Sequence, residues 1–417
     1  RIKEAEVNFK KAIKIKPDFS LAYNSLGAIQ KDLGDLVGAE ANFNKAIKIK
    51  PDYVEAYTNL GATKKELGDL EAAEISLIKA IELKPDYVNA YVILGMIKSQ
   101  LGKFKDAEKY YLKVIDLKPD YSEVHYHLAM LLYESERYKE AEEHYKLVDT
   151  KESENNLLRC LYHQNKKNDF YDQLDLMINL NKCNAVMGSL IYRSELRYGI
   201  KKKNVFCENP IKYVSKINLT EQCDFKSIFI DTTKSLLKND SVTFRSQGLL
   251  THGQQTAGNL FNLKNDLIIK IYDLINLQIQ KYRNHFKDSK EGFLRNWPDD
   301  YSLYGWLISL KNGGSLRSHM HDLSWISGSI YINVPPKLQT DSGNLVLNKD
   351  YPSSHPNYDS PDKNVSSSLS KINEEQVKIV DVVTGSLCLF PSSLLHHTIP
   401  FESTEDRIVL AFDVRAK

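Results

Sequence analysis

The sequence has 417 residues, enough for two or three domains that each bury a core of their own. Its composition is typical of a soluble globular protein, with 42% hydrophobic residues, 26% charged residues and a formal net charge of +2. This near balance gives no electrostatic reason to expect a nucleic acid or a membrane surface as the main partner. No apolar run approaches the ~20 residues that a membrane-spanning helix needs.

The five cysteines are scattered, odd in number and without a CxxC pair. They are Cys160, Cys183, Cys207, Cys223 and Cys388. This pattern favours neither a disulfide framework nor a zinc–thiolate site. We therefore expect reduced thiols and a cytoplasmic location.

The first part of the chain is periodic. A Lys-Pro-Asp triplet recurs with a spacing of 34 residues, and its prolines are Pro17, Pro51, Pro85 and Pro119. In the same register each unit has an aromatic residue, a Leu-Gly pair and then a large side chain between alanines. The Leu-Gly glycines are Gly27, Gly61 and Gly95, and the large side chains are Phe43, Leu77 and Tyr111.

Each unit is predicted to form two helices. The aromatic residue and the Leu-Gly pair share one helical face, the glycine allows a second helix to approach, and the proline ends that second helix. The pattern resembles the tetratricopeptide repeat, whose period is 34 residues. The resemblance covers residues 1–150: a partial first unit, three well-formed units and a degenerate fifth, in which His125 and Ala129 replace the tyrosine and the glycine.

A stacked array of such repeats forms a concave surface that suits an extended peptide or a partner helix. We therefore expect a protein or peptide partner at the repeats. The alternative is that the repeats only fold, dimerise or space the second domain. Residues 151–225 lose the register but keep helical periodicity, and they are predicted to form a helical connector.

From residue 226 onward, short β-rich segments separated by turn residues follow a helix predicted at 259–285. The predicted strands are 301–310, 328–334, 343–347, 377–383, 385–390 and 407–414. This order predicts an antiparallel sandwich or barrel of the jelly-roll type over residues 226–417. The fold class is thus α+β multidomain, with an all-α repeat solenoid followed by a β domain with packing helices.

Histidines concentrate at the ends of these strands. Because alternate side chains of a strand share a face, His319 and His321 can bind one metal ion together. A third ligand must come from a later strand beside the first. The candidates are His396 and His397, and only one of them can point inward.

The segments SLRSHMHDLSWISGSIYINV, FPSSLLHHTIPF and DRIVLAFDV, with GLLTHGQQTAGNLF upstream, resemble the 2-oxoglutarate and Fe(II)-dependent oxygenases. The resemblance covers about residues 205–417 and is closest to a bacterial and phage-type branch often fused to tetratricopeptide repeats. It implies a double-stranded β-helix in which His396 is the distal iron ligand. It also implies that Arg407 binds the remote carboxylate of 2-oxoglutarate and that His397 faces outward.

The first motif departs from the family pattern. A facial triad shows His-x-Asp or His-x-Glu, whereas this chain has His-x-His followed by Asp322. Three arrangements are open. His319, His321 and His396 can all bind iron, Asp322 can reach the metal through a bulge in place of one histidine, or water can take the second position.

The resemblance implies an Fe(II)- and 2-oxoglutarate-dependent dioxygenase, with O2 and 2-oxoglutarate as cosubstrates and hydroxylation of an unidentified substrate as the usual outcome. No catalytic residue beyond the metal ligands is expected. The alternatives are a catalytically inactive metal-binding or scaffold protein acting through the repeats, and a cupin-like metalloenzyme that does not use 2-oxoglutarate. Arg407 favours the oxygenase over the cupin-like enzyme.

The polar segment 348–376 is too long for a routine connection, and we interpret it as a lid over the iron site, with an exposed His355. Trp325 and Tyr331 are close to the first motif in sequence. They are predicted either to line the pocket or to belong to the core.

Overall fold

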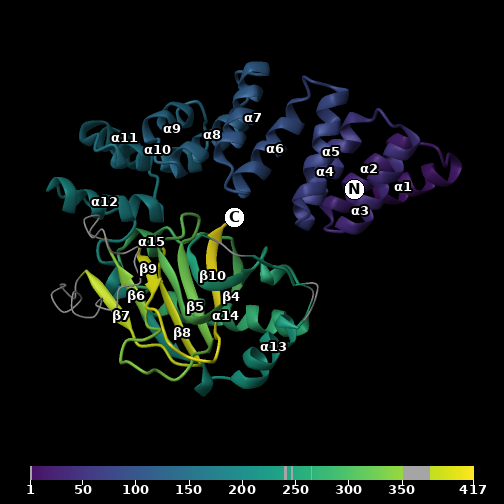
Figure 1. Cartoon of the computed structure of the whole chain (residues 1–417). Coiled ribbons are helices and arrows are strands. Elements are labelled where there is room, and N and C mark those ends of the chain that lie inside the picture. The colour runs from purple at the N-terminus through teal and green to yellow at the C-terminus, as the bar shows by residue number, and fades with distance from the viewer. Residues whose placement is uncertain (1, 239–241, 246–247, 264, 351–375) are drawn as a thin grey trace. The chain divides into compact units, whose positions relative to one another are not determined.

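The computed structural model describes residues 2–238, 242–245, 248–263, 265–350 and 376–417 (Figure 1). The chain forms two compact units, Arg1–Phe170 and Tyr171–Lys417. The finer division into 1–150, 151–225 and 226–417 stays a prediction. Within the described residues, no helix combines the length and the apolar character needed to cross a membrane.

The first unit consists of consecutive helices, as the repeat pattern predicts. Its helices are α1 (Ile2–Ile15), α2 (Ser20–Asp32), α3 (Leu36–Ile49), α4 (Val54–Leu67), α5 (Leu70–Leu83), α6 (Val88–Gln100), α7 (Phe104–Leu117), α8 (Ser122–Glu134), α9 (Tyr138–Tyr145) and α10 (Lys151–His163). Helix α11 (Lys167–Asn179) runs from the end of this unit into the next.

Close helix packing within each repeat depends on the Leu-Gly glycine. Gly27 lies against the ring of Phe43, and Gly95 lies against the ring of Tyr111, so that a Cβ at either glycine would overlap the ring. The turn between paired helices uses a second glycine with positive φ, as at Gly68 (φ 88°), a conformation that suits a residue without Cβ. The sequence register therefore corresponds to helix contacts, and the repeat solenoid is confirmed.

The second unit places helices before and beside a β domain. Its longer helices are α12 (Ala185–Tyr198), α13 (Thr232–Leu237), α14 (Asp266–His285) and α15 (Gly292–Arg295). The short helices are η1 (Pro210–Tyr213), η2 (Leu219–Glu221), η3 (Lys226–Asp231) and η4 (Leu260–Asn262). The strands are β1 (Ser215–Asn218), β2 (Phe244–Arg245), β3 (Leu250–Thr256), β4 (Tyr301–His319), β5 (Ile326–Asn333), β6 (Leu345–Asn348), β7 (Val377–Val380), β8 (Ser386–Pro391), β9 (Leu395–Thr398) and β10 (Arg407–Ala416).

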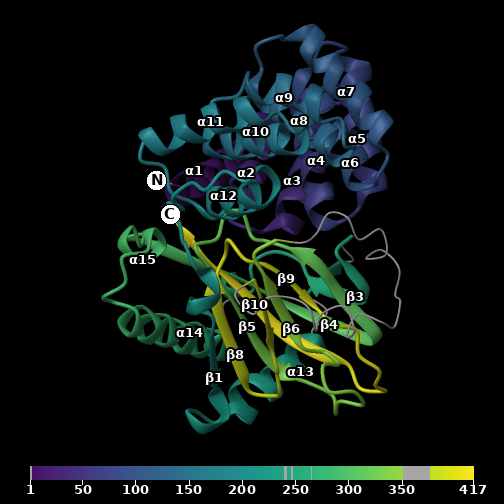
Figure 2. The same ribbon diagram turned by 90° about the vertical axis from the view of Figure 1, so that its left-hand side faces the viewer.

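Strand β4 belongs to both sides of the β domain (Figure 2). The strand order is β1-β8-β5-β10-β4-β9-β6-β7, with antiparallel pairing. Residues 301–310 of β4 pair with β10, whereas Leu316 and His319 pair with β9. The change of partner follows an irregularity of β4 around Gly313 (φ 71°), where its pairing with β3 shifts in register. This arrangement is a barrel-like double-stranded β-helix, and the predicted fold class is confirmed.

The two faces of β10 have different surroundings. Leu410, Phe412 and Val414 face the main core, which contains the α14 residues Ile268, Ile271, Ile275 and Ile279. The alternate residues Arg407, Val409, Ala411 and Asp413 point to the other face, toward the inside of the barrel. This alternation is why one strand can both close the hydrophobic core and carry polar groups to the site.

The predicted strands of this domain are all observed, but β1, β2 and β3 were not predicted, and β1 lies within the predicted helical connector 151–225. Strand β4 continues to His319, past the predicted end at 310, and β9 (Leu395–Thr398) was not predicted as a strand. The predicted helix 259–285 is α14, preceded by the short η4. The predicted lid and His355 lie mostly outside the described residues, which end at Asp350 and resume at Gln376.

Candidate metal centre

Three imidazoles converge at one end of the barrel. His319 is the last residue of β4, and β9 places His396 directly opposite it. His321 follows in the turn after β4. The ring centroid of His319 is 4.2 Å from that of His396 and 5.0 Å from that of His321. One nitrogen atom of each ring lies within 4.8 Å of the corresponding atoms of the other two rings.

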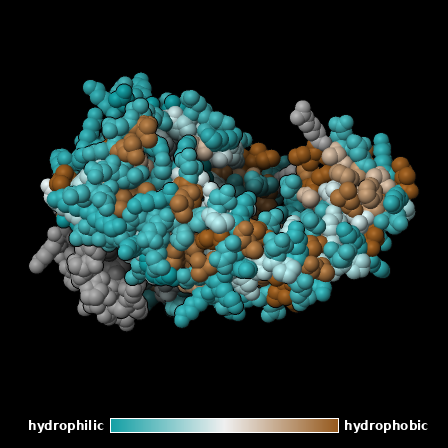
Figure 3. Space-filling view, turned by 90° about the horizontal axis from the view of Figure 1, so that it is seen from above, coloured by the Kyte–Doolittle hydropathy of each residue, from teal (hydrophilic) through white to brown (hydrophobic). Residues whose placement is uncertain are grey.

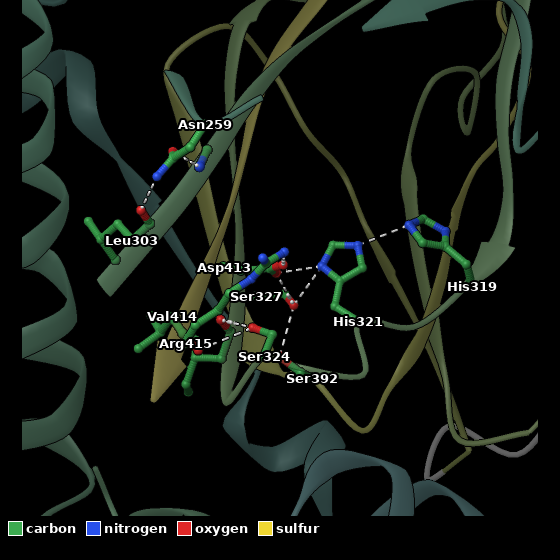
Figure 4. A network of polar contacts seen from close by, with 12 residues as sticks. Asn259, Leu303, His319, His321, Ser324, Ser327, Ser392, Asp413, Val414 and Arg415 are labelled. Atoms are coloured by element: carbon green, nitrogen blue, oxygen red, sulfur yellow. Dashed lines mark hydrogen bonds and ion pairs between the residues drawn. The ribbon is translucent and has the colours of Figure 1, made fainter. Parts of the chain in front are cut away.

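The hydrogen bonds of two of these rings select their tautomers. His319 Nδ1 lies 2.9 Å from the backbone oxygen of Arg317. His321 Nδ1 lies 2.6 Å from Asp413 Oδ1, and Figure 4 shows this contact. Both partners are acceptors, so each Nδ1 carries the proton and donates it. The Nε2 atoms then carry lone pairs, and they face each other at 3.0 Å. In this tautomer both Nε2 atoms can donate a lone pair to one metal ion.

The spacing of these nitrogen atoms suits a six-coordinate metal ion. Two imidazoles bound at about 2.1 Å to adjacent corners of an octahedron have ligand atoms about 3.0 Å apart. The Nε2 atoms of His319 and His321 have this separation. The donor set therefore fits a divalent ion such as Fe(II), for which imidazole is a suitable ligand.

Burial keeps two of the three histidines neutral. It lowers the pKa of His319 to about 4, and the neighbouring His321 adds to the effect. Burial also lowers the pKa of His396 well below its usual value, with further contributions from His319 and His321. Because a metal ion binds the neutral ring, both residues are ready to bind metal without first losing a proton near neutral pH.

The remaining predicted ligand candidates lie differently. Within the described part of the chain, the cluster contains the three histidines and does not include Asp322. His397 alternates with His396 on β9 and is outside the cluster as well. It is buried, with 5% of its surface exposed, and burial lowers its pKa to about 4.

Arg407 is a buried cation without an ion-pair partner among the described residues. It opens β10 with 1% of its surface exposed, and its guanidinium lies 5.1 Å from the ring centroid of Tyr331. None of its three nitrogen atoms has a hydrogen-bond partner among the described residues. Burial lowers its pKa, although the phenol group of Tyr331 and the thiol of Cys388 oppose the shift. A desolvated guanidinium with free donors is a ready site for a carboxylate.

The guanidinium and the imidazoles border the same interior. The ring of Phe390 lies 5.0 Å from that of His396 and belongs to the interior cluster that includes Tyr331 and Val409. On the inward faces of β5 and β10, Tyr331 pairs with Val409 and the smaller Ser329 pairs with Ala411. Ser329 is partly exposed although its strand neighbours are buried.

Sequence reasoning missed several residues of the site. Asp413 accepts hydrogen bonds from His321, from Ser327 at 3.2 Å and from Arg415 at 3.1 Å. Burial alone would raise the pKa of Asp413, but His321 and Arg415 together hold it below its usual value. Trp306 adds a ring 5.4 Å from that of His321. Asp413 shares the strand face of Arg407, an alternation that was visible in the sequence.

The sequence left open whether Tyr331 and Trp325 line the pocket or belong to the core, and the two residues differ in this respect. Tyr331 points into the barrel beside Arg407, where burial raises its pKa. Trp325 donates its indole N–H to the backbone oxygen of Phe293, and its ring packs at 5.4 Å from that of Phe206, in the main core. Tyr331 is therefore a residue of the site, and Trp325 is a core residue.

Comparison with known proteins finds different families in the N-terminal and C-terminal parts of the chain. A family model described as "Putative 2OG-Fe(II) oxygenase" matches residues 304–413, which include all three histidines and Arg407. Tetratricopeptide-repeat models match residues 31–68, 54–87 and 99–159. None of the curated proteins matches the chain.

Several solved structures are similar to part of the chain. MamA is 24% identical over 40% of this chain and 91% of its own, with a TM-score of 0.33. PilF of Pseudomonas aeruginosa is 22% identical over 43% of this chain and 84% of its own, with a TM-score of 0.39. YrrB, a protein with tetratricopeptide repeats and an unusual peptide-binding site, is 19% identical over 41% of this chain and 91% of its own, with a TM-score of 0.35.

Proposed function

We propose that the chain is an Fe(II)- and 2-oxoglutarate-dependent dioxygenase. The proposal starts from the family matches, which combine tetratricopeptide repeats with a 2OG-Fe(II) oxygenase domain. The observation that carries the proposal is the pairing of Arg407 with the histidine cluster. A buried guanidinium without a partner among the described residues and three convergent imidazoles border one interior. A cation site and an anion site in the same barrel match a divalent metal and a dicarboxylate.

In this proposal His319, His321 and His396 hold Fe(II), so that the arrangement with three imidazoles is favoured over the two alternatives with Asp322 or water. Arg407 binds the carboxylate of 2-oxoglutarate that is remote from the metal, through the planar fork of its donors. With both bound, the metal supplies O2-dependent oxidative decarboxylation of the cosubstrate, coupled to oxidation of a substrate.

The chain's own residues position and shield these groups. Three protein ligands leave three positions of a six-coordinate ion for the cosubstrate and O2. The backbone oxygen of Arg317 and the carboxylate of Asp413 keep two of the rings in the tautomer that presents Nε2. Phe390 covers one side of His396 and limits the access of water from that side.

The test is an anaerobic titration with Fe(II) followed by 2-oxoglutarate. We expect a weak visible charge-transfer band that needs both additions, and succinate on admission of air. Arg407→Ala should bind Fe(II) but lose the response to 2-oxoglutarate. Arg283→Ala is a matched control, because Arg283 is an exposed arginine on α14. Iron binding without any effect of 2-oxoglutarate, unchanged in Arg407→Ala, would contradict the proposal.

The repeats extend the proposal to a polypeptide partner or substrate. Their surface keeps exposed apolar side chains, such as Val37 at 72% and Ile75 at 70% exposure. On the face drawn in Figure 3, apolar groups lie scattered within a mostly hydrophilic surface. Repeats of this kind bind extended peptides or helices.

Capture experiments with the full chain test this extension. A captured polypeptide should gain an oxygen atom in its mass when Fe(II), 2-oxoglutarate and air are supplied together. Capture without any such gain would support the alternative in which the repeats act as a scaffold.

A further inference from the structure

A fully buried carboxylate stands behind one of the three histidines. Asp413 is 2% exposed, on the barrel-facing side of β10. Its Oδ1 accepts the Nδ1–H of His321 at 2.6 Å and the hydroxyl of Ser327 at 3.2 Å. Its Oδ2 accepts from Arg415 Nη2 at 3.1 Å. Both oxygen atoms are therefore held in place, and one of them is directed at the imidazole.

The Asp413 carboxylate contacts the His321 ring on the side opposite the proposed metal position. Figure 4 shows His321 between Asp413 and His319, with Nδ1 toward the carboxylate and Nε2 toward His319. Asp413 cannot bind the metal directly without losing its hydrogen bonds from Arg415 and Ser327. Its route to the metal is through the ring of His321.

Three neutral imidazoles bring no negative charge to a divalent ion, whereas the usual facial triad brings one carboxylate. We propose that Asp413 is a positioning residue that supplies this missing negative charge through His321. The inference rests on the proposed function, because it takes the three histidines as metal ligands. A carboxylate that accepts the Nδ1 proton makes Nε2 a stronger donor to the metal and fixes the ring orientation.

Neighbouring hydroxyls support the same geometry. Ser327 stands opposite Asp413 in the β5–β10 pairing, and its Oγ lies 3.1 Å from His321 Nδ1. Ser392 Oγ lies 2.9 Å from Ser327 Oγ. The carboxylate and the ring are thus held by residues of β5 and β10 and by Ser392, which follows β8.

Two substitutions separate the charge from the orientation. Asp413→Asn keeps an oxygen acceptor at nearly the same place and removes the charge, and Asp413→Ala removes both. Affinity is measured by anaerobic titration of the metal-free full chain with Fe(II), and with Co(II) as a spectroscopic probe. We expect both variants to lose about 10–100-fold in affinity. The absorption bands of bound Co(II) should shift in Asp413→Asn.

The matched control is Glu142→Gln. Glu142 is a buried carboxylate of the first unit, 4% exposed and paired with Lys146 and Lys166. It is expected to lose stability and to keep the metal affinity of the unchanged protein. Wild-type affinity and an unshifted Co(II) spectrum in Asp413→Asn would overturn the inference alone. A wild-type chain that binds neither Fe(II) nor Co(II) would overturn the proposed function as well.

A measurement on the unchanged protein covers the case in which the Asp413 variants do not fold. Zinc is a diamagnetic substitute for proton NMR of the loaded chain. We expect a strongly downfield Nδ1–H resonance assigned to His321 by selective labelling, as a short hydrogen bond to a carboxylate produces. A His321 Nδ1–H resonance at the position of His319, which donates to a backbone carbonyl, would contradict the inference.

Discussion

His319 on β4 lies directly opposite His396 on β9, with ring centroids 4.2 Å apart. The cross-strand register thus brings together residues from distant parts of the sequence. Because successive side chains of a strand point to opposite faces, a slip of one residue would turn His397 inward in place of His396. The register of a short strand, β9, therefore decides which imidazole faces the metal position.

Substitutions on β9 should show this difference. His396→Ala is expected to reduce Fe(II) affinity at least 100-fold, because it removes one of the three proposed ligands. His397→Gln should keep the affinity within about twofold, because its ring is outside the cluster. Anaerobic titration of the metal-free protein measures both. Equal losses in the two variants would contradict the assignment of His396 as the inward ligand.

Substitution of Arg407 should stabilise the metal-free protein and at the same time weaken the binding of 2-oxoglutarate. Its buried donors lack partners among the described residues, so Arg407→Met should raise the free energy of unfolding of the metal-free protein by about 1–3 kcal/mol. The same variant should lose stabilisation by 2-oxoglutarate, which for the unchanged protein is about 2.7 kcal/mol at a hundred times the Kd. Urea unfolding with and without the cosubstrate measures both effects.

The comparison variant for this prediction is Arg283→Met, in which an exposed arginine is replaced. It should change neither the stability by more than about 0.5 kcal/mol nor the response to 2-oxoglutarate. Destabilisation of the metal-free protein by Arg407→Met would mean that the guanidinium has a stabilising partner in the fold.

The sequence was most informative where the pattern is local or repeated. The spacing of 34 residues located the helix pairs, because Gly95 and Tyr111 must meet for each pair to pack. Strand periodicity located β10. His319 and His321 lie in one cluster, but strand alternation does not bring them together, because β4 ends at His319 and His321 follows in the turn. These features depend on contacts between neighbours in sequence or on the period of one element.

The missed features depend on pairing between distant strands. Strand β9 is four residues long and was not predicted, because its sequence Leu-His-His-Thr has no strand signal of its own. Asp413 became part of the site only when β10 was seen to run past the turn that carries His321. A sequence does not show which residues of one strand lie beside the turn after another.

Acid should destabilise the metal-free protein through its buried histidines. His397 has a folded-state pKa of about 4, below the ~6.5 of an unfolded chain, so between these values the unfolded state binds more protons. Its contribution to stability is complete above ~6.5 and is lost as the pH falls toward 4. From about pH 7 to about pH 5 the loss from this residue is roughly 2 kcal/mol.

Urea unfolding of the metal-free chain at the two pH values measures this loss. His397→Gln should reduce the difference between them by about that amount, because glutamine does not titrate. A variant that keeps the full pH dependence would show that His397 is protonated equally in the folded and unfolded states. The lowered pKa values of His319 and His396 add to the same acid loss in both proteins.

Gly95→Ala should weaken the repeat unit and leave the metal site unchanged. Alanine is acceptable to the helix, since Ala129 occupies the corresponding position of the next repeat with no exposed surface. At Gly95, however, the new Cβ would overlap the Tyr111 ring, whose rigid side chain cannot move aside cheaply. We expect a loss of about 1–3 kcal/mol in the stability of residues 1–170. Hydrogen exchange should show faster opening in α6 and α7, while Fe(II) affinity remains that of the unchanged protein. A fall in Fe(II) affinity with the same substitution would mean that the two units fold as one cooperative body.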